Sequence, residues 1–203
     1  MRLPVLFLII PALIVTNKGY GQNGVRFGIN TGVTYSDIRG YPEAEIYNYD
    51  FGLLAGFTIE YILNEKLSLK SSLNFERKRF SWNYDDLLDP VDPLYTGPFF
   101  RIYDYLTVPI LINLNFGRSD NFFINGGSFF GYLINAEYKV DGIVLEDLNS
   151  SISKFDFGLS LGIGTLIALN DKNNLTIEIR DNLGMSYEKT NSIILSVGWN
   201  FNP

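Results

Sequence analysis

Apolar and polar residues alternate along most of the chain with a period of two. In residues 25–35, apolar side chains occupy most odd positions, and polar residues or glycines lie between them. Successive side chains of a β-strand point to opposite faces, so this pattern predicts strands with one apolar and one polar face. The same alternation predicts eight strands, at residues 25–35, 51–63, 67–75, 100–116, 122–136, 155–169, 175–187 and 193–201. In the fifth of these, Phe123, Phe129 and Leu133 lie opposite the main apolar face.

The length of these segments and the charges on their polar faces indicate a membrane environment. Several segments exceed the roughly five or six residues of a globular strand and match the roughly 9–11 residues of a tilted transmembrane strand. Their polar faces carry long charged side chains, whereas a soluble barrel turns its apolar face inward. We therefore predict an all-β fold, an eight-stranded antiparallel up-and-down transmembrane β-barrel whose apolar face contacts lipid.

The charges on the polar faces are the candidate functional residues. A barrel of about eight strands has an interior that side chains just fill, and an unpaired charge there would be costly to desolvate. The charges are therefore predicted to pair with one another and to plug the lumen. The predicted plug consists of Arg26, Glu60, Lys70, Glu76, Arg101, Asp156, Glu178 and Arg180. An alternative assigns Asp156, Glu178 and Arg180 to a proton or ion relay.

The connections between the predicted strands alternate in length. Short connections at residues 64–66, 117–121 and 170–174 follow the second, fourth and sixth strands, and longer ones follow the first, third and fifth. Outer-membrane barrels have short periplasmic turns and longer outer loops. Both ends of the mature chain are therefore expected on the periplasmic side.

The first residues have the features of an export signal. Arg2 supplies a positive charge, residues 3–15 are largely apolar, and Gly19 and Gly21 are small residues suited to a cleavage site. We predict a cleaved signal peptide at residues 1–21 and an outer-membrane β-barrel domain at residues 22–203. The alternative is a single transmembrane anchor, but the apolar stretch is shorter than the roughly 20 residues that a spanning helix needs.

The composition excludes several kinds of chemistry. The net charge of −6 and the absence of a long basic run give a nucleic-acid partner no electrostatic support. The chain contains no cysteine and no histidine, which removes thiol chemistry and the usual general base. We predict that the protein is not an enzyme, with no catalytic residue and no cofactor.

One acidic cluster is a candidate Ca²⁺ site. The residues Asp85, Asp86, Asp89 and Asp92 lie close together in one predicted loop. Oxygen-rich loops of this kind can bind Ca²⁺, but the spacing does not match an EF-hand. An ordinary solvated acidic loop is the alternative.

Three segments resemble a known family. They are the glycine-rich strand at residues 27–32, the Tyr-Leu-Thr-Val-Pro-Ile-Leu-Ile segment at residues 105–112, and residues 155–162. Together they resemble the PorT-like outer-membrane β-barrel domain family of Bacteroidetes-type bacteria. The resemblance implies an eight-stranded barrel and a link to protein secretion across the outer membrane. Thr107 stands where that family's pattern leads us to expect an acidic residue.

These observations predict a non-enzymatic integral outer-membrane protein with a structural or accessory role. Its expected partners are outer-membrane lipid and other envelope or secretion proteins. One alternative is a small channel or transporter, which would have an open, water-filled lumen. Another is a soluble ligand-binding barrel, which would turn its apolar residues inward.

Overall fold

The computed structural model describes residues 24–39, 47–82, 98–117, 121–140, 143–150, 152–170 and 172–201. The predicted signal peptide and the predicted Ca²⁺ loop lie outside these ranges. The strands within them are β1 (Val25–Ile38), β2 (Asn48–Ile62), β3 (Leu67–Trp82), β4 (Phe99–Phe116), β5 (Phe122–Val140), β6 (Ile143–Asp147), β7 (Phe155–Asn170), β8 (Asn173–Gly184) and β9 (Thr190–Phe201). No helix in the described ranges is long and apolar enough to cross a membrane.

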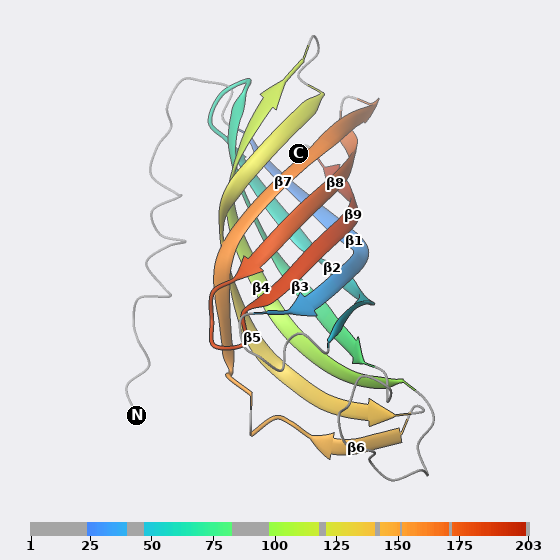
Figure 1. Ribbon diagram of the computed structural model, residues 1–203. Coiled ribbons are helices and arrows are strands. Elements are labelled where there is room, and N and C mark those ends of the chain that lie inside the picture. Colours follow the sequence, from blue (N-terminus) through green and yellow to red (C-terminus); the bar gives the residue numbers. More distant parts are fainter. Residues whose placement is uncertain are drawn as a thin grey trace.

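Eight of these strands close into a barrel (Figure 1). Each strand from β1 to β5 pairs antiparallel with the next, β5 pairs with β7, and β7, β8 and β9 continue the sheet. The barrel closes where β1 pairs with β9, from Phe27 opposite Phe201 to Ile38 opposite Thr190. The predicted eight-stranded antiparallel barrel is confirmed.

The facing of the strands also agrees with the prediction. Lipid-side apolar residues are well exposed, as for Leu161, which is 71% exposed, whereas Glu178 on the adjacent strand is 3% exposed. On β5, Phe123 and Phe129 point inward and are buried. Ile102 is an exception: the sequence places it on the apolar outer face, but it is only 8% exposed. It lies between Arg79 and Glu137, where the outer wall is already polar.

The strands extend further than the sequence pattern indicated. The third strand was predicted to end at Phe75, but β3 runs on to Trp82. The charged residues from Glu76 to Arg79 hide the apolar alternation, yet the alternation of facing continues, because every second residue from Glu76 to Trp82 is buried. One strand, β6, was not among the eight predicted. It pairs with the end of β5.

The two ends of the barrel differ. At one end, which we call the short-turn end, tight turns join β2 to β3 and β7 to β8. The side-chain oxygen of Asn64 accepts hydrogen bonds from the backbone N–H groups of Lys66 and Leu67, both at 2.9 Å, as is typical of asparagine in turns. At the other end, which we call the loop end, β3, β4 and β5 extend beyond their neighbours and β6 lies outside the barrel (Figure 1).

Candidate functional site

The lumen of the barrel is the candidate functional site, and buried or half-buried polar side chains fill it in three groups. In the group nearest the short-turn end, the Arg26 guanidinium contacts the Glu60 carboxylate at 2.8 Å. Glu60 also accepts hydrogen bonds from Ser68 and from Asn113. These residues come from β1, β2, β3 and β4, so the ion pair bridges neighbouring strands near one mouth of the barrel.

Glu178 of β8 lies at the centre of the second group. Its carboxylate contacts Lys70 Nζ at 2.6 Å and Arg180 Nη1 at 3.3 Å, and it accepts a hydrogen bond from Asn125 at 3.0 Å. Lys70 projects from β3, on the opposite wall, so this contact crosses the lumen. A cavity of about 10 Å³ beside this group has room on the order of one water molecule.

The third group surrounds Asp156, near the loop end. Its carboxylate contacts Lys78 Nζ at 2.8 Å and accepts hydrogen bonds from Ser186 at 2.7 Å and Thr190 at 2.8 Å. A second carboxylate, Glu76, lies 3.9 Å from Lys78 Nζ. All of these side chains are buried, so each charge depends on its protein partners rather than on water.

The structure brings most of the predicted plug residues into these groups. Arg26 and Glu60 form the first group, Lys70, Glu178 and Arg180 meet in the second, and Asp156 and Glu76 flank Lys78 in the third. Lys78 was not among the predicted plug residues, because the predicted third strand ended at Phe75. The signal was present, since Lys78 has the same parity as Lys70 and Glu76.

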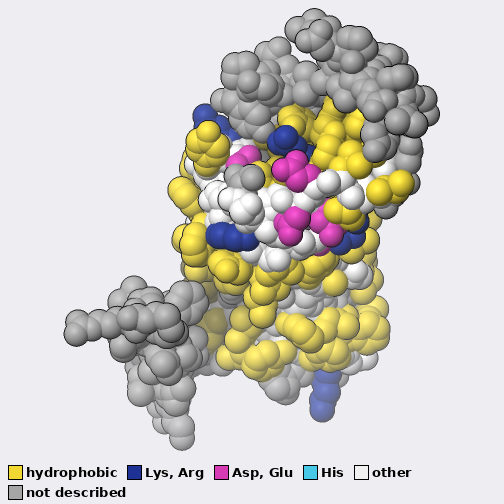
Figure 2. Space-filling view, turned by 90° about the horizontal axis from the view of Figure 1, so that it is seen from below, with side chains coloured by type: hydrophobic (Ala, Val, Ile, Leu, Met, Phe, Trp, Pro, Cys, Tyr) yellow, Lys and Arg dark blue, Asp and Glu magenta, His cyan; other side chains and the backbone are white. Residues whose placement is uncertain are grey.

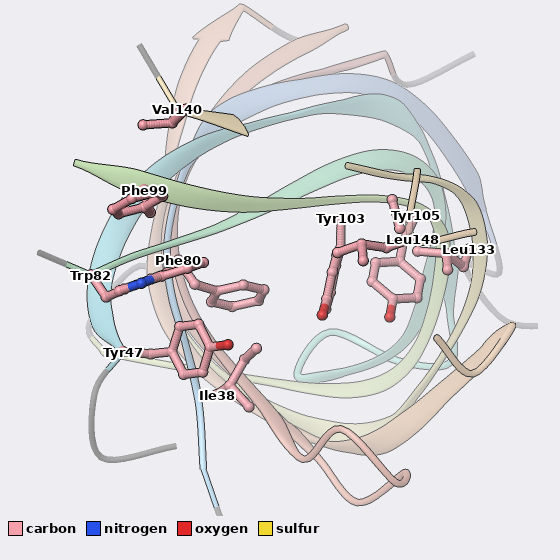
Figure 3. Packing of buried hydrophobic residues seen from close by; sticks show 11 residues of the cluster. Ile38, Tyr47, Phe80, Trp82, Phe99, Tyr103, Tyr105, Leu133, Val140 and Leu148 are labelled. Atoms are coloured by element: carbon pink, nitrogen blue, oxygen red, sulfur yellow. The ribbon is translucent and has the colours of Figure 1, made fainter. Parts of the chain in front are cut away.

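Arg101 lies apart from the three groups, in an apolar cluster inside the loop end of the barrel. Its guanidinium lies over the ring of Tyr47 at 5.1 Å and near that of Trp82. In Figure 3, Phe80 and Tyr103 point into the barrel, while Phe99 and Val140 lie toward one side of it. The cluster consists of Ile38, Tyr47, Phe80, Trp82, Phe99, Tyr103, Tyr105, Leu133, Ala136, Val140 and Leu148. This apolar core was not predicted from the sequence, whose alternation indicated a polar lumen.

The connection between β8 and β9 also turns inward. Ser186 and Glu188 are buried, while Tyr187 between them is exposed. Burial raises the pKa of the Glu188 carboxyl above its ordinary value, and the nearby Arg101 charge partly offsets this effect. Seen from the loop end, acidic side chains lie beside Lys and Arg side chains in the middle of the described surface (Figure 2). The loop end therefore adds both apolar and polar groups to the lumen filling.

Ion pairs on the outer wall show where lipid contact ends. The Arg77 guanidinium forms a bidentate contact with Asp104, at 2.7 and 2.8 Å, and Lys139 contacts Glu137 at 2.7 Å. Charged side chains are costly in the bilayer core. Since these pairs lie on the loop-end extensions of β3, β4 and β5, those extensions lie outside the hydrocarbon region.

Thr190 and Lys78 place a hydroxyl next to an amine inside the lumen, the arrangement of a nucleophile and its base, but both groups are buried. The Thr190 hydroxyl lies 2.8 Å from Lys78 Nζ, as in a nucleophile activated by lysine. Both residues are completely buried, and the hydroxyl is already bonded to Asp156. In the part of the chain that the structure describes, no group of three or more acidic residues could hold a metal ion.

A closed antiparallel barrel with an apolar belt outside and paired charges inside defines a transmembrane β-barrel of the outer-membrane type. The sequence comparison agrees: the chain belongs to the family of the outer membrane protein beta-barrel domain, whose model matches residues 17–188. Proteins of this class sit in the membrane and contact lipid. No curated protein sequence matches the chain.

Solved structures show the same fold. The outer membrane protein AlkL, determined in lipid bilayers, matches with a TM-score of 0.51 and 14% identity, over 93% of this chain and 94% of that one. Neisserial surface protein A matches with a TM-score of 0.50 and 14% identity, over 89% of this chain and 97% of that one. At such low identity, these likenesses concern the fold alone.

Proposed function

We propose that this protein is a sealed, non-enzymatic outer-membrane barrel with a structural or accessory role, acting through its loop end rather than through its lumen. The observation that carries the proposal is the filling of the lumen. Three polar groups, the second and third of them centred on a buried carboxylate, follow one another along the barrel, and an apolar core lies beside the third. A channel or transporter would need a continuous water-filled path, and a soluble carrier would need an apolar cavity.

The polar groups hold the lumen closed through contacts that span the barrel. Lys70 and Lys78, both on β3, reach Glu178 and Asp156 on β8 and β7. Opening the lumen would separate these charges, and a buried charge without its partner is strongly unfavourable. These contacts across the lumen therefore favour a closed, rigid barrel over a gated pore.

The resemblance to PorT-like barrels favours protein secretion as the process that the barrel serves. It rests on residues 105–112 and 155–162, which lie on β4 and β7. Thr107, where an acidic residue is expected from that family, faces the lumen and is buried. We therefore do not assign to this protein any function that would need an acidic residue at position 107.

The proposal is tested by permeability of cells. Expression of the barrel should leave the uptake of a small hydrophilic β-lactam unchanged, measured by its hydrolysis in the periplasm of cells that express the protein and of cells that lack it. A porin expressed to the same level is the positive control. Uptake that rises with the amount of folded barrel would favour the channel alternative and contradict the proposal.

We also propose that the loop end faces the outside of the cell, because outer-membrane barrels place short turns in the periplasm. A cysteine replacing Glu146 should react with a membrane-impermeant maleimide on intact cells, whereas one replacing Lys172 should react only after the cells are broken. Both positions are exposed and the chain has no native cysteine, so each label reports one site. The opposite pattern would reverse the orientation.

A further inference from the structure

The strand β6 is an exposed apolar edge at the loop end. It pairs with residues Glu137 to Val140 of β5, beyond Tyr132 and Phe155, where β5 stops pairing with β7. Among the strands that the structure describes, β6 is bonded to β5 alone. Within the described residues, its second edge therefore has no partner strand, and it lies at the end of the sheet, below the mouth of the barrel in Figure 1.

The first three side chains of β6 are apolar and exposed. Ile143, Val144 and Leu145 are 61%, 49% and 38% exposed. Ile143 and Val144 lie opposite Val140 and Lys139 of β5, and Leu145 falls at a register shift, so the neighbours on β5 leave all three side chains exposed. Runs of exposed apolar residues outside a lipid belt are typical of interaction sites.

Lipid does not account for these residues. The segment of β5 that pairs with β6 itself carries the ion pair of Lys139 and Glu137, so the hairpin lies outside the hydrocarbon region. An open strand edge is also excluded from the hydrocarbon region, where its backbone groups would have no hydrogen-bond partners. The exposed edge therefore belongs in water or among headgroups.

The hairpin is held in place rather than loosely attached. The backbone N–H of Leu148, directly after β6, donates to the carbonyl of Ala136 at 2.9 Å. The Leu148 side chain packs in the apolar cluster with Tyr103 and Leu133. An ordered edge loses little conformational entropy when another strand binds to it.

We infer that β6 is a docking strand for an extended segment of another envelope protein, which adds to the open edge by β-strand pairing. The exposed residues at 143–145 favour a segment with β-branched or other apolar residues. Glu146 and Asp147 at the end of the strand favour lysine or arginine at the matching end of that segment. This inference rests on the proposed function, since it assigns a contact site to the loop end.

The test uses purified full-length barrel in detergent and a short fluorescent peptide that alternates valine and threonine and ends in lysine. Saturable binding is expected by fluorescence anisotropy. The same peptide with alternate backbone nitrogens methylated, which cannot complete a strand ladder, should bind at least about tenfold more weakly. Equal binding of the two peptides, or no binding of either, would overturn the inference.

Variants locate the site. Ile143→Ser with Leu145→Ser should weaken peptide binding about tenfold, and Glu146→Lys should weaken it in a way that added salt reduces. Tyr187→Ser, an exposed change on another loop-end connection, is the matched control and should bind as the native protein does. Heat-dependent gel mobility verifies that each variant is folded. Binding that survives the changes in β6 would contradict the proposed site.

Two further outcomes would replace the proposed partner. Self-association in analytical ultracentrifugation that Ile143→Ser abolishes would assign β6 to a second copy of this chain. A blue shift of a fluorophore at position 144 on adding lipid vesicles, without peptide, would assign it to lipid headgroups. Failure of peptide binding leaves the permeability result untouched, so it is distinguishable from failure of the proposed function.

Discussion

Replacing Lys78 with methionine should destabilise the barrel by about 3–5 kcal/mol, the usual effect of removing one member of a buried ion pair. Methionine keeps most of the volume of lysine but leaves Asp156 without its cation and Glu76 without its nearest one. Since these groups are completely buried, water cannot replace the lost interaction. The measurement is urea-induced unfolding of the barrel in lipid vesicles, followed by tryptophan fluorescence.

Two comparisons make the result specific to the buried network. Lys172→Met, at an exposed turn, should change the free energy of unfolding by less than about 0.5 kcal/mol. Adding Asp156→Asn to Lys78→Met removes the unpaired carboxylate at position 156. The double variant should therefore recover part of the lost stability. If Lys78→Met were no more harmful than Lys172→Met, the ion pair would not contribute to closing the lumen.

Replacing Leu161 with arginine should destabilise the folded barrel by about 2–4 kcal/mol, because the side chain lies on the lipid face near the middle of β7. The matched control is Leu169→Arg, on the same face near the end of the same strand, where the cost should be about 0–1 kcal/mol. Folding into vesicles and urea titration of both variants provide the comparison. Equal costs at the two depths would contradict the assignment of this face to the bilayer.

The barrel itself could be predicted from the sequence because its strands are encoded by neighbouring residues. Alternation between Leu161 and its polar neighbours follows directly from the geometry of a strand, and strand length follows from the thickness of the membrane. The same rule located most of the lumen charges. It failed on β3 after Phe75, where charged residues face both the lumen and the outer ion pairs, so parity no longer coincides with polarity.

The pairing of the lumen charges could not be predicted, because it depends on contacts between distant parts of the chain. Lys70 and Glu178 are 108 residues apart, and Lys78 and Asp156 are 78 residues apart. Which charges meet depends on the register and stagger of all eight strands, which no local pattern encodes. The apolar core at the loop end was not predicted for a related reason. The residue type alone does not say whether an aromatic side chain such as that of Tyr103 faces lipid or the lumen.

A sealed lumen predicts that the purified barrel forms no channels, which single-channel recording in planar lipid bilayers measures directly. Barrels of about eight strands have side-chain-filled interiors, whereas aqueous channels occur in barrels of about 16 strands. We expect no stable channel steps from folded protein whose insertion is verified by heat-dependent gel mobility, under conditions in which a porin conducts. Sustained, porin-sized conductance that scales with the amount of inserted barrel would show that the lumen is open.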